Sequence, residues 1–191
     1  MKVATIGLGY VGLPLGLQFF RSGVQVLGLV IDDTKVQAIQ SGRSYIKHID
    51  SAAIRDLVSG GKFSASTDFT KIREVDSVII CVPTPLTGNR EPDISFILRT
   101  VSIAPHLTRG TLVVLESATY PGTTEEDLRP VLESGSGLKA GVDFFLAFSP
   151  EREDPGNPAY IELAHWAECV VDTRNAMAAY QEKYPAKIWK A

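Results

Sequence analysis

Three glycines near the amino terminus are spaced to hold a pair of phosphates. Gly7, Gly9 and Gly12 form the pattern G-x-G-x-x-G, directly after a short apolar run and before a leucine-rich stretch. In a strand–turn–helix unit the first glycine permits a sharp turn, the second leaves room for a pyrophosphate and the third allows the helix to pack closely on the strand. The pattern predicts a dinucleotide site, although the same glycines also suit a βα turn that binds nothing.

An acidic pair follows the next apolar run. Asp32 lies about twenty positions after Gly12, where a carboxylate commonly accepts hydrogen bonds from an adenosine ribose. Asp32 and Asp33 equally suit the cap of the following helix, and both interpretations stay open. Because two carboxylates would repel a 2′-phosphate and no arginine stands ready to receive one, the sequence favours NAD over NADP.

Further polar residues follow later strands. Ser117, Thr119 and Tyr120 come just after the strand expected at residues 111–115 and suit either a site or a tight turn. Glu151 follows the last expected strand, where it would be a general base or only a surface carboxylate.

Cysteines and histidines give no metal pattern. Cys81 lies inside an expected strand, and Cys169 has no cationic neighbour in the sequence, so both are interpreted as structural. His48, His106 and His165 are scattered, and we predict no metal site.

Strands alternating with helices must position these residues. The strands are expected at residues 3–6, 24–31, 62–67, 76–82, 111–115 and 143–148. The pattern predicts an α/β fold with a Rossmann-like, doubly wound parallel sheet in the order 3-2-1-4-5-6 and a short C-terminal appendage. The carboxyl ends of the strands would then gather the glycine turn, residues 82–84, 117–120 and 149–151 along one edge.

The helices are predicted in less detail. Asp93 is expected to cap one helix over residues 94–104. Residues 123–126 (TTEE) suggest a capping box that opens a helix ending near Leu132, and residues 134–141 a flexible link.

Composition limits the function classes. The chain has 191 residues, a net charge of −3 and 45% hydrophobic residues, with no cluster of Lys or Arg. We therefore expect no nucleic-acid partner and no membrane span. Met1 leads directly into the first strand, so no signal peptide is expected and the cytoplasm is the predicted location.

The chain is predicted to divide near residue 158. Residues 1–158 would form the nucleotide-binding domain. Residues 159–191 are too few for a core of their own, so they would pack on that domain, pair with another chain or stay loose.

Six ordered motifs resemble those of the UDP-glucose/GDP-mannose dehydrogenase family. They are residues 7–14 (GLGYVGLP), 42–49 (GRSYIKHI), 81–86 (CVPTPL), 91–93 (EPD), 120–125 (YPGTTE) and 149–157 (SPEREDPGN). The likeness is strongest to UDP-N-acetylglucosamine 6-dehydrogenases of bacterial surface-polysaccharide pathways. The resemblance implies an oxidoreductase that converts the primary alcohol of a UDP-sugar to a carboxylate with two NAD⁺, through a cysteine-bound intermediate.

The resemblance also assigns roles to residues. It implies a pyrophosphate held by Gly7, Gly9, Tyr10, Val11 and Gly12, an adenosine contact from Lys35, and a nicotinamide path along Val82, Pro83 and Thr84. Glu151 would handle the hydrolytic water.

Two positions depart from the family pattern. The family's ribose-binding Asp falls at Val30, so Asp32 would have to replace it. Its active-site Thr falls at Ala118, with Thr119 adjacent.

A third and larger departure is that this sequence has no segment matching the family's central helix or its catalytic Cys, Lys and Asn. Residues 168–176 resemble instead the family's last strand and turn, so residues 159–191 are interpreted as a remnant of its C-terminal domain. The sequence thus predicts an NAD-binding domain that is incomplete as an enzyme. The alternatives are an inactive NAD-binding module, or one half of a split enzyme whose other half is a separate chain. The predicted protein partner is accordingly a second copy, in a homodimer, or the chain that carries the missing half.

Overall fold

The computed structural model describes residues 1–85, 88, 93–150, 170–172 and 188–190. The chain forms two units, Met1–Arg152 and Glu153–Ala191. In the second unit, β7 (Val170–Asp172) pairs in parallel with β8 (Ile188–Lys190). The predicted boundary at residue 158 and the origin of residues 159–191 stay predictions, because most of that segment lies outside the described residues.

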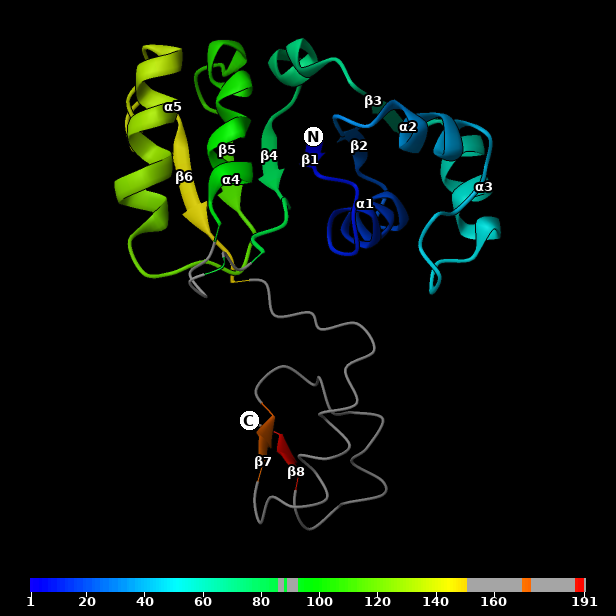
Figure 1. The fold of residues 1–191 in the computed structure, drawn as a ribbon. Helices are drawn as coiled ribbons and strands as arrows, with labels where there is room; N and C mark the ends of the chain where they lie inside the picture. Colours follow the sequence, from blue (N-terminus) through cyan, green and yellow to red (C-terminus); the bar gives the residue numbers. More distant parts are fainter. Residues whose placement is uncertain (86–87, 89–92, 151–169, 173–187, 191) are drawn as a thin grey trace. The chain divides into compact units, whose positions relative to one another are not determined.

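The first unit contains a six-stranded parallel sheet in the order β3-β2-β1-β4-β5-β6, which confirms the predicted Rossmann-like topology (Figure 1). The strands are β1 (Lys2–Ile6), β2 (Gln25–Leu29), β3 (Phe63–Ser66), β4 (Ser77–Ile80), β5 (Leu112–Leu115) and β6 (Phe145–Phe148). β1 begins one residue earlier than expected, whereas the other five strands are shorter than their expected apolar runs, because those runs continue into the loops at the strand ends.

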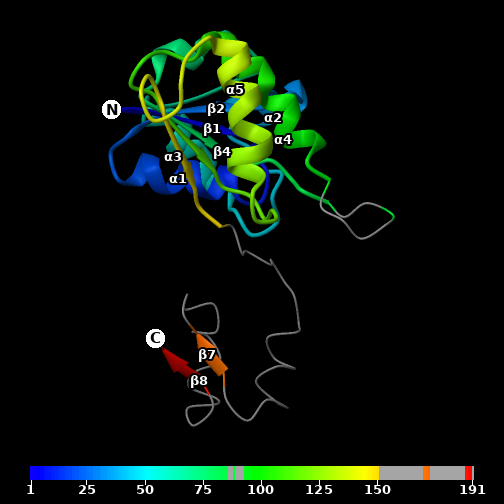
Figure 2. The ribbon, with the colours of Figure 1, turned by 90° about the vertical axis from the view of Figure 1, so that its left-hand side faces the viewer.

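Helical segments connect these strands (Figure 2). The α-helices are α1 (Gly12–Arg21), α2 (Asp33–Gln40), α3 (Ser51–Ser59), α4 (Ser95–Arg99) and α5 (Arg129–Ser136). Two 3₁₀ segments, η1 (Phe69–Glu74) and η2 (Thr100–His106), and one π-helical segment, η3 (Thr123–Leu128), complete the set. None of the helices within this described part has the length and apolar character needed to cross a bilayer.

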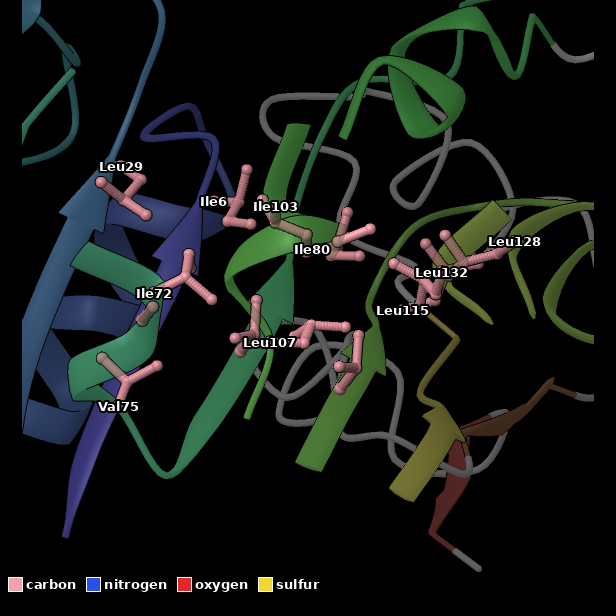
Figure 3. Close-up of a cluster of buried hydrophobic side chains, with 14 of the residues drawn as sticks. Ile6, Leu29, Ile72, Val75, Ile80, Ile103, Leu107, Leu115, Leu128 and Leu132 are labelled. Carbon is pink, nitrogen blue, oxygen red and sulfur yellow. The ribbon is translucent and has the colours of Figure 1, made fainter. Parts of the chain in front are cut away.

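Hydrophobic cores lie on both faces of the sheet, because alternate strand residues point to opposite sides. On one face, residues such as Ile6, Leu29 and Ile80 pack against η1, α4, η2 and α5 (Figure 3). On the other, α1, α2 and α3 pack over β2 and β3, with Leu13 and Ile54 fully buried. Because helical segments cover both faces of the sheet, the strands are continuous apolar runs in the sequence.

A helical segment does lie at residues 94–104, as predicted. The prediction that it is one continuous α-helix is wrong. The α-helix ends at Arg99 and continues as the 3₁₀ segment η2. Thr100 is buried, and its hydroxyl donates to the carbonyl of Ile97 at 2.6 Å. A threonine that bonds back to its own helix competes with the regular backbone pattern, which favours the tighter winding. Asp93 nevertheless accepts from the N–H of Ser95, as a cap should.

The capping box predicted at residues 123–126 is wrong. Gly122 precedes the helix with a φ of +101°, and the Thr123 hydroxyl donates to the carbonyl of Tyr120 at 2.9 Å. The first turn is π-helical, and the N–H of Glu126 bonds to the carbonyl of Gly122. The predicted link at 134–141 also begins too early, because α5 runs to Ser136.

A threonine in β1 provides a test of the packing. Thr5 is fully buried, and within the described residues its hydroxyl has no hydrogen-bond partner. We expect Thr5→Val to raise the free energy of unfolding by about 1 kcal/mol, because it removes an unsatisfied buried donor. Denaturant unfolding measures the change. Thr123→Val is the matched control and should lower stability, since that hydroxyl is bonded; a loss in both variants would contradict the prediction.

Candidate cofactor-binding site

A cavity of about 890 Å³ runs across the carboxyl ends of β2, β1, β4 and β5. Its lining comes from the turn after β1, the start of α2, the loops after β4 and β5, and one face of α4 and η2. This is the edge at which nucleotides bind in doubly wound sheets. The members of the predicted site that line it are Gly7, Gly9, Tyr10, Val11, Asp32, Lys35, Val82, Pro83 and Thr84.

Two of the glycines are required by packing within the protein. Gly7 has a φ of +91°, which side chains rarely adopt, and a Cβ there would lie 2.5 Å from the carbonyl oxygen of Cys81. A Cβ on Gly12 would lie 1.9 Å from the carbonyl oxygen of Gly7. The turn therefore folds tightly only with glycine at both positions, and this holds α1 against β1.

Gly9 is different, because a Cβ there would have no atom of the described residues within 4 Å. Packing does not explain this glycine. The open space lies in the cavity lining, beside the amino end of α1. Among the described residues no side chain caps α1, and its first turn holds no acidic residue. A helix end of this kind attracts an anion, so the space fits a pyrophosphate.

Asp32 caps α2 and also lines the cavity. Its Oδ1 accepts from the N–H of Thr34 at 3.0 Å and from the Thr34 hydroxyl at 2.5 Å. The Thr34 hydroxyl holds the pKa of the Asp32 carboxyl below its usual value, so the group is charged at neutral pH. The structure confirms the cap, and the ribose contact stays a prediction for a residue that lines the cavity.

Tyr45 is a cavity residue that the sequence did not single out. Its hydroxyl donates to the carbonyl of Leu8, inside the glycine turn, at 2.7 Å. Lys35 places its Nζ 5.6 Å from the centre of the Tyr45 ring. Burial, with a smaller contribution from the charge of Asp32, raises the pKa of Tyr45, so its hydroxyl remains a donor. No local pattern could reveal this contact, because it joins residues far apart in the chain.

The exposed Tyr10 ring extends the same arrangement. Its centre lies 5.7 Å from that of His48, which comes from the loop that carries Tyr45. Tyr45 and His48 thus contact the glycine turn at two of its residues, Leu8 and Tyr10. We expect the loop to hold the turn in one conformation, because each contact opposes movement of the other.

Two hydroxyl groups join the loops after β4 and β5. Thr84 donates to the carbonyl of Ala118 at 2.6 Å, and Ser117 donates to the carbonyl of Val82 at 3.0 Å. We call this reciprocal pair the β4–β5 clasp. The clasp holds residues 82–84 in the cavity wall. The Thr84 hydroxyl donates its hydrogen to the Ala118 carbonyl within the protein.

The two predicted catalytic residues stay predictions. Thr119 is half-buried, and within the described residues its hydroxyl has no hydrogen-bond partner, but it does not line the cavity. Glu151 lies outside the described residues. Gly12, the remaining predicted cofactor residue, packs against Gly7 and does not line the cavity.

The comparisons with known proteins agree with this geometry. Residues 1–188 match the model of the UDP-glucose/GDP-mannose dehydrogenase family, NAD binding domain. The chain belongs to this family. The part that matches is the NAD-binding domain, so NAD is the cofactor of this domain. The match extends past the predicted boundary at residue 158, and the domain division itself stays a prediction.

Curated members of the dehydrogenase family are much longer than this chain. UDP-N-acetyl-D-mannosamine dehydrogenase of Pyrococcus horikoshii is 40% identical over 186 residues, which cover 96% of this chain and 44% of the relative. UDP-N-acetyl-D-glucosamine 6-dehydrogenase of Pseudomonas aeruginosa is 36% identical over 158 residues, 82% of this chain and 36% of the relative. The chain thus spans less than half the length of these two relatives.

Solved structures of family members show the same fold. A ternary complex of GDP-mannose dehydrogenase from Pseudomonas aeruginosa is similar with a TM-score of 0.77 at 28% identity, covering 100% of this chain and 46% of that one. The UDP-D-ManNAc dehydrogenase of Pyrococcus horikoshii gives a TM-score of 0.75 at 32% identity, covering 100% and 47%.

The β4–β5 clasp is open to a direct test. Ser117 is 3% exposed, so Ser117→Ala leaves the Val82 carbonyl without its donor in a buried setting. We expect a loss of about 1 kcal/mol in the free energy of unfolding, measured with denaturant. Ser59→Ala, at an exposed helix end, should change stability by less than about 0.5 kcal/mol. Equal effects of the two variants would show that the clasp contributes nothing specific.

Proposed function

We propose that this chain binds NAD in the described cavity, as the cofactor-binding part of a nucleotide-sugar dehydrogenase. The observation that carries the proposal is the open space at Gly9, set between two glycines that packing requires. Gly7, Gly9, Tyr10, Val11 and Gly12 would hold the pyrophosphate there, with their backbone and the amino end of α1.

The adenosine half would lie at the β2 end of the cavity. Ile31, Asp32 and Lys35 line that end, and Ile31 is 81% exposed. The exposed Ile31 side chain offers apolar surface against which an adenine ring could pack. Phe96 and Arg99, whose guanidinium lies 5.7 Å from the Phe96 ring centre, also line the cavity.

The nicotinamide half would lie at the β4 and β5 ends. Val82, Pro83 and Thr84 form the wall there, kept in place by the β4–β5 clasp. Because the clasp engages the Thr84 hydroxyl, we propose that this residue positions the wall and contacts the cofactor through its other atoms. Thr119 and Glu151 remain the proposed catalytic residues, with Glu151 handling the hydrolytic water; Thr119 does not line the cavity.

The reaction proposed for the complete enzyme is oxidation of the primary alcohol of a UDP-N-acetylhexosamine to the uronic acid. The oxidation needs two NAD⁺, each of which would accept one hydride from the alcohol carbon, and water would supply the second oxygen of the carboxylate. This choice of substrate rests on the relatives, which are UDP-N-acetyl-D-mannosamine and UDP-N-acetyl-D-glucosamine dehydrogenases. A UDP-sugar partner, a second copy of the chain and a cytoplasmic location remain predictions from the sequence.

A binding module without turnover is the second candidate. Of the described residues that line the cavity, the lysine is Lys35, at the proposed adenosine end, and the cysteine is Cys81, which is 6% exposed. Lys35 lies at the other end of the cavity from the nicotinamide, and Cys81, although next to Val82, is almost fully buried. The described residues therefore support cofactor binding better than the complete reaction.

Substitution of Gly9 tests the binding site. We expect Gly9→Ala to leave thermal stability unchanged, because its Cβ meets no protein atom, and to weaken NAD⁺ binding by about tenfold or more. Isothermal titration calorimetry measures the affinity. Gly88→Ala is the matched control, since a Cβ there also meets nothing within 4 Å and Gly88 does not line the cavity. Unchanged NAD⁺ binding by Gly9→Ala would contradict the proposed position of the pyrophosphate.

Turnover separates the two candidate functions. We expect the purified chain, mixed with NAD⁺ and UDP-N-acetylglucosamine or UDP-N-acetylmannosamine, to bind NAD⁺ but form no NADH, followed by absorbance. Steady NADH formation together with a UDP-uronic acid product would show that the chain is a complete enzyme and would rule out the binding module.

A further inference from the structure

The residue directly after β2 cannot hold an adenosine ribose in this chain. Val30 occupies that position, is 7% exposed and has no side-chain hydrogen-bonding group. A ribose diol needs an acceptor at this end of the cavity, because its hydroxyl groups lose water on binding. The acceptor must therefore come from the residues that follow.

Asp32 has one carboxylate oxygen available for this purpose. Both bonds from Thr34 go to Oδ1, and in the part of the chain that the structure describes no hydrogen bond reaches Oδ2. Asp32 lines the cavity, whereas its neighbour Asp33 does not and bonds the side chain of Gln37 instead. The two acidic residues of the pair therefore have different roles.

Thr34 orients this carboxylate. Its hydroxyl and its N–H hold the same oxygen, which fixes the carboxylate plane at the first turn of α2. The same hydrogen bond keeps Asp32 ionised, as its lowered pKa indicates. Lys35, the next residue, also lines the cavity, and its positive charge attracts Asp32.

We propose that Asp32, oriented by Thr34, selects NAD over NADP in this chain, in place of the residue that directly follows β2. This inference rests on the proposed function, since it needs the adenosine ribose at the β2 end of the cavity. Oδ2 would accept a hydrogen bond from a ribose hydroxyl, and its charge would repel a 2′-phosphate. Asp32 is thus the specificity-determining residue and Thr34 its positioning residue.

Asp32→Asn tests the proposal without removing the helix cap. Asparagine caps helices about as well as aspartate, so the variant should fold and keep its thermal stability. It loses the charge that binds a ribose hydroxyl strongly and repels a phosphate, while Lys35 remains. We expect the ratio of NAD⁺ to NADP⁺ affinity to fall by about tenfold or more, measured by calorimetry on the full chain.

Two further sets of variants serve as controls. Asp33→Asn removes the same charge one residue away and should leave the ratio within about twofold of wild type, since Asp33 does not line the cavity. Thr34→Val should lower the ratio with little loss of stability, and Thr34→Ser should restore it, because serine keeps the hydroxyl. A purely structural role for Thr34 would change the melting temperature without changing the ratio.

The outcomes separate this inference from the proposed function. If the wild-type chain binds neither NAD⁺ nor NADP⁺, the proposed function fails and the inference with it. If wild type prefers NAD⁺ and Asp32→Asn keeps the same preference, cofactor binding stands and the inference is overturned. An equal shift from Asp33→Asn would also overturn it, because the effect would then be general charge and not a specific contact.

Discussion

The carbonyl oxygen of Gly7 faces Gly12 so closely that a Cβ on Gly12 would stand 1.9 Å away. This backbone contact sets the angle at which α1 leaves β1, and the other features of the cavity follow from it. In the described part of the chain no side chain caps the amino end of α1, and a Cβ on Gly9 would meet no atom of that part within 4 Å. A tight turn that leaves a positive helix end facing a hollow is suited to bind an anion.

The rest of the cavity is held by contacts between segments far apart in the sequence. Tyr45 bonds the carbonyl of Leu8, so the loop after α2 supports the glycine turn. The β4–β5 clasp joins two loops whose strands are neighbours only because the chain crosses the sheet between them. The acceptor in each of these hydrogen bonds is a backbone carbonyl, which has no side-chain rotamers. We therefore expect the bonds to hold the cavity walls in place.

The end of the cavity proposed for adenosine has an acidic residue at a different position from the one that the resemblance implies. A valine stands where the resemblance leads us to expect an acidic residue, yet a carboxylate lines the cavity two positions later. The helix cap of α2 and the proposed ribose contact share one side chain, with one oxygen for each. A single aspartate can serve both because the cap engages only Oδ1.

The sequence by itself determined the sheet order and the packing roles of Gly7 and Gly12, and it offered Asp32 as a helix cap, because each depends on local spacing and on apolar runs that a buried parallel strand explains. The helix predictions at Thr100 and at residues 123–126 were wrong. There the hydroxyl of Thr100 or Thr123 donates to a backbone carbonyl three residues earlier. Only the tertiary structure decided that Tyr45 and the β4–β5 clasp build the cavity, since those bonds join positions 34 to 37 residues apart. Such contacts leave no periodic signal in a single chain, because they depend on how elements pack after they have formed.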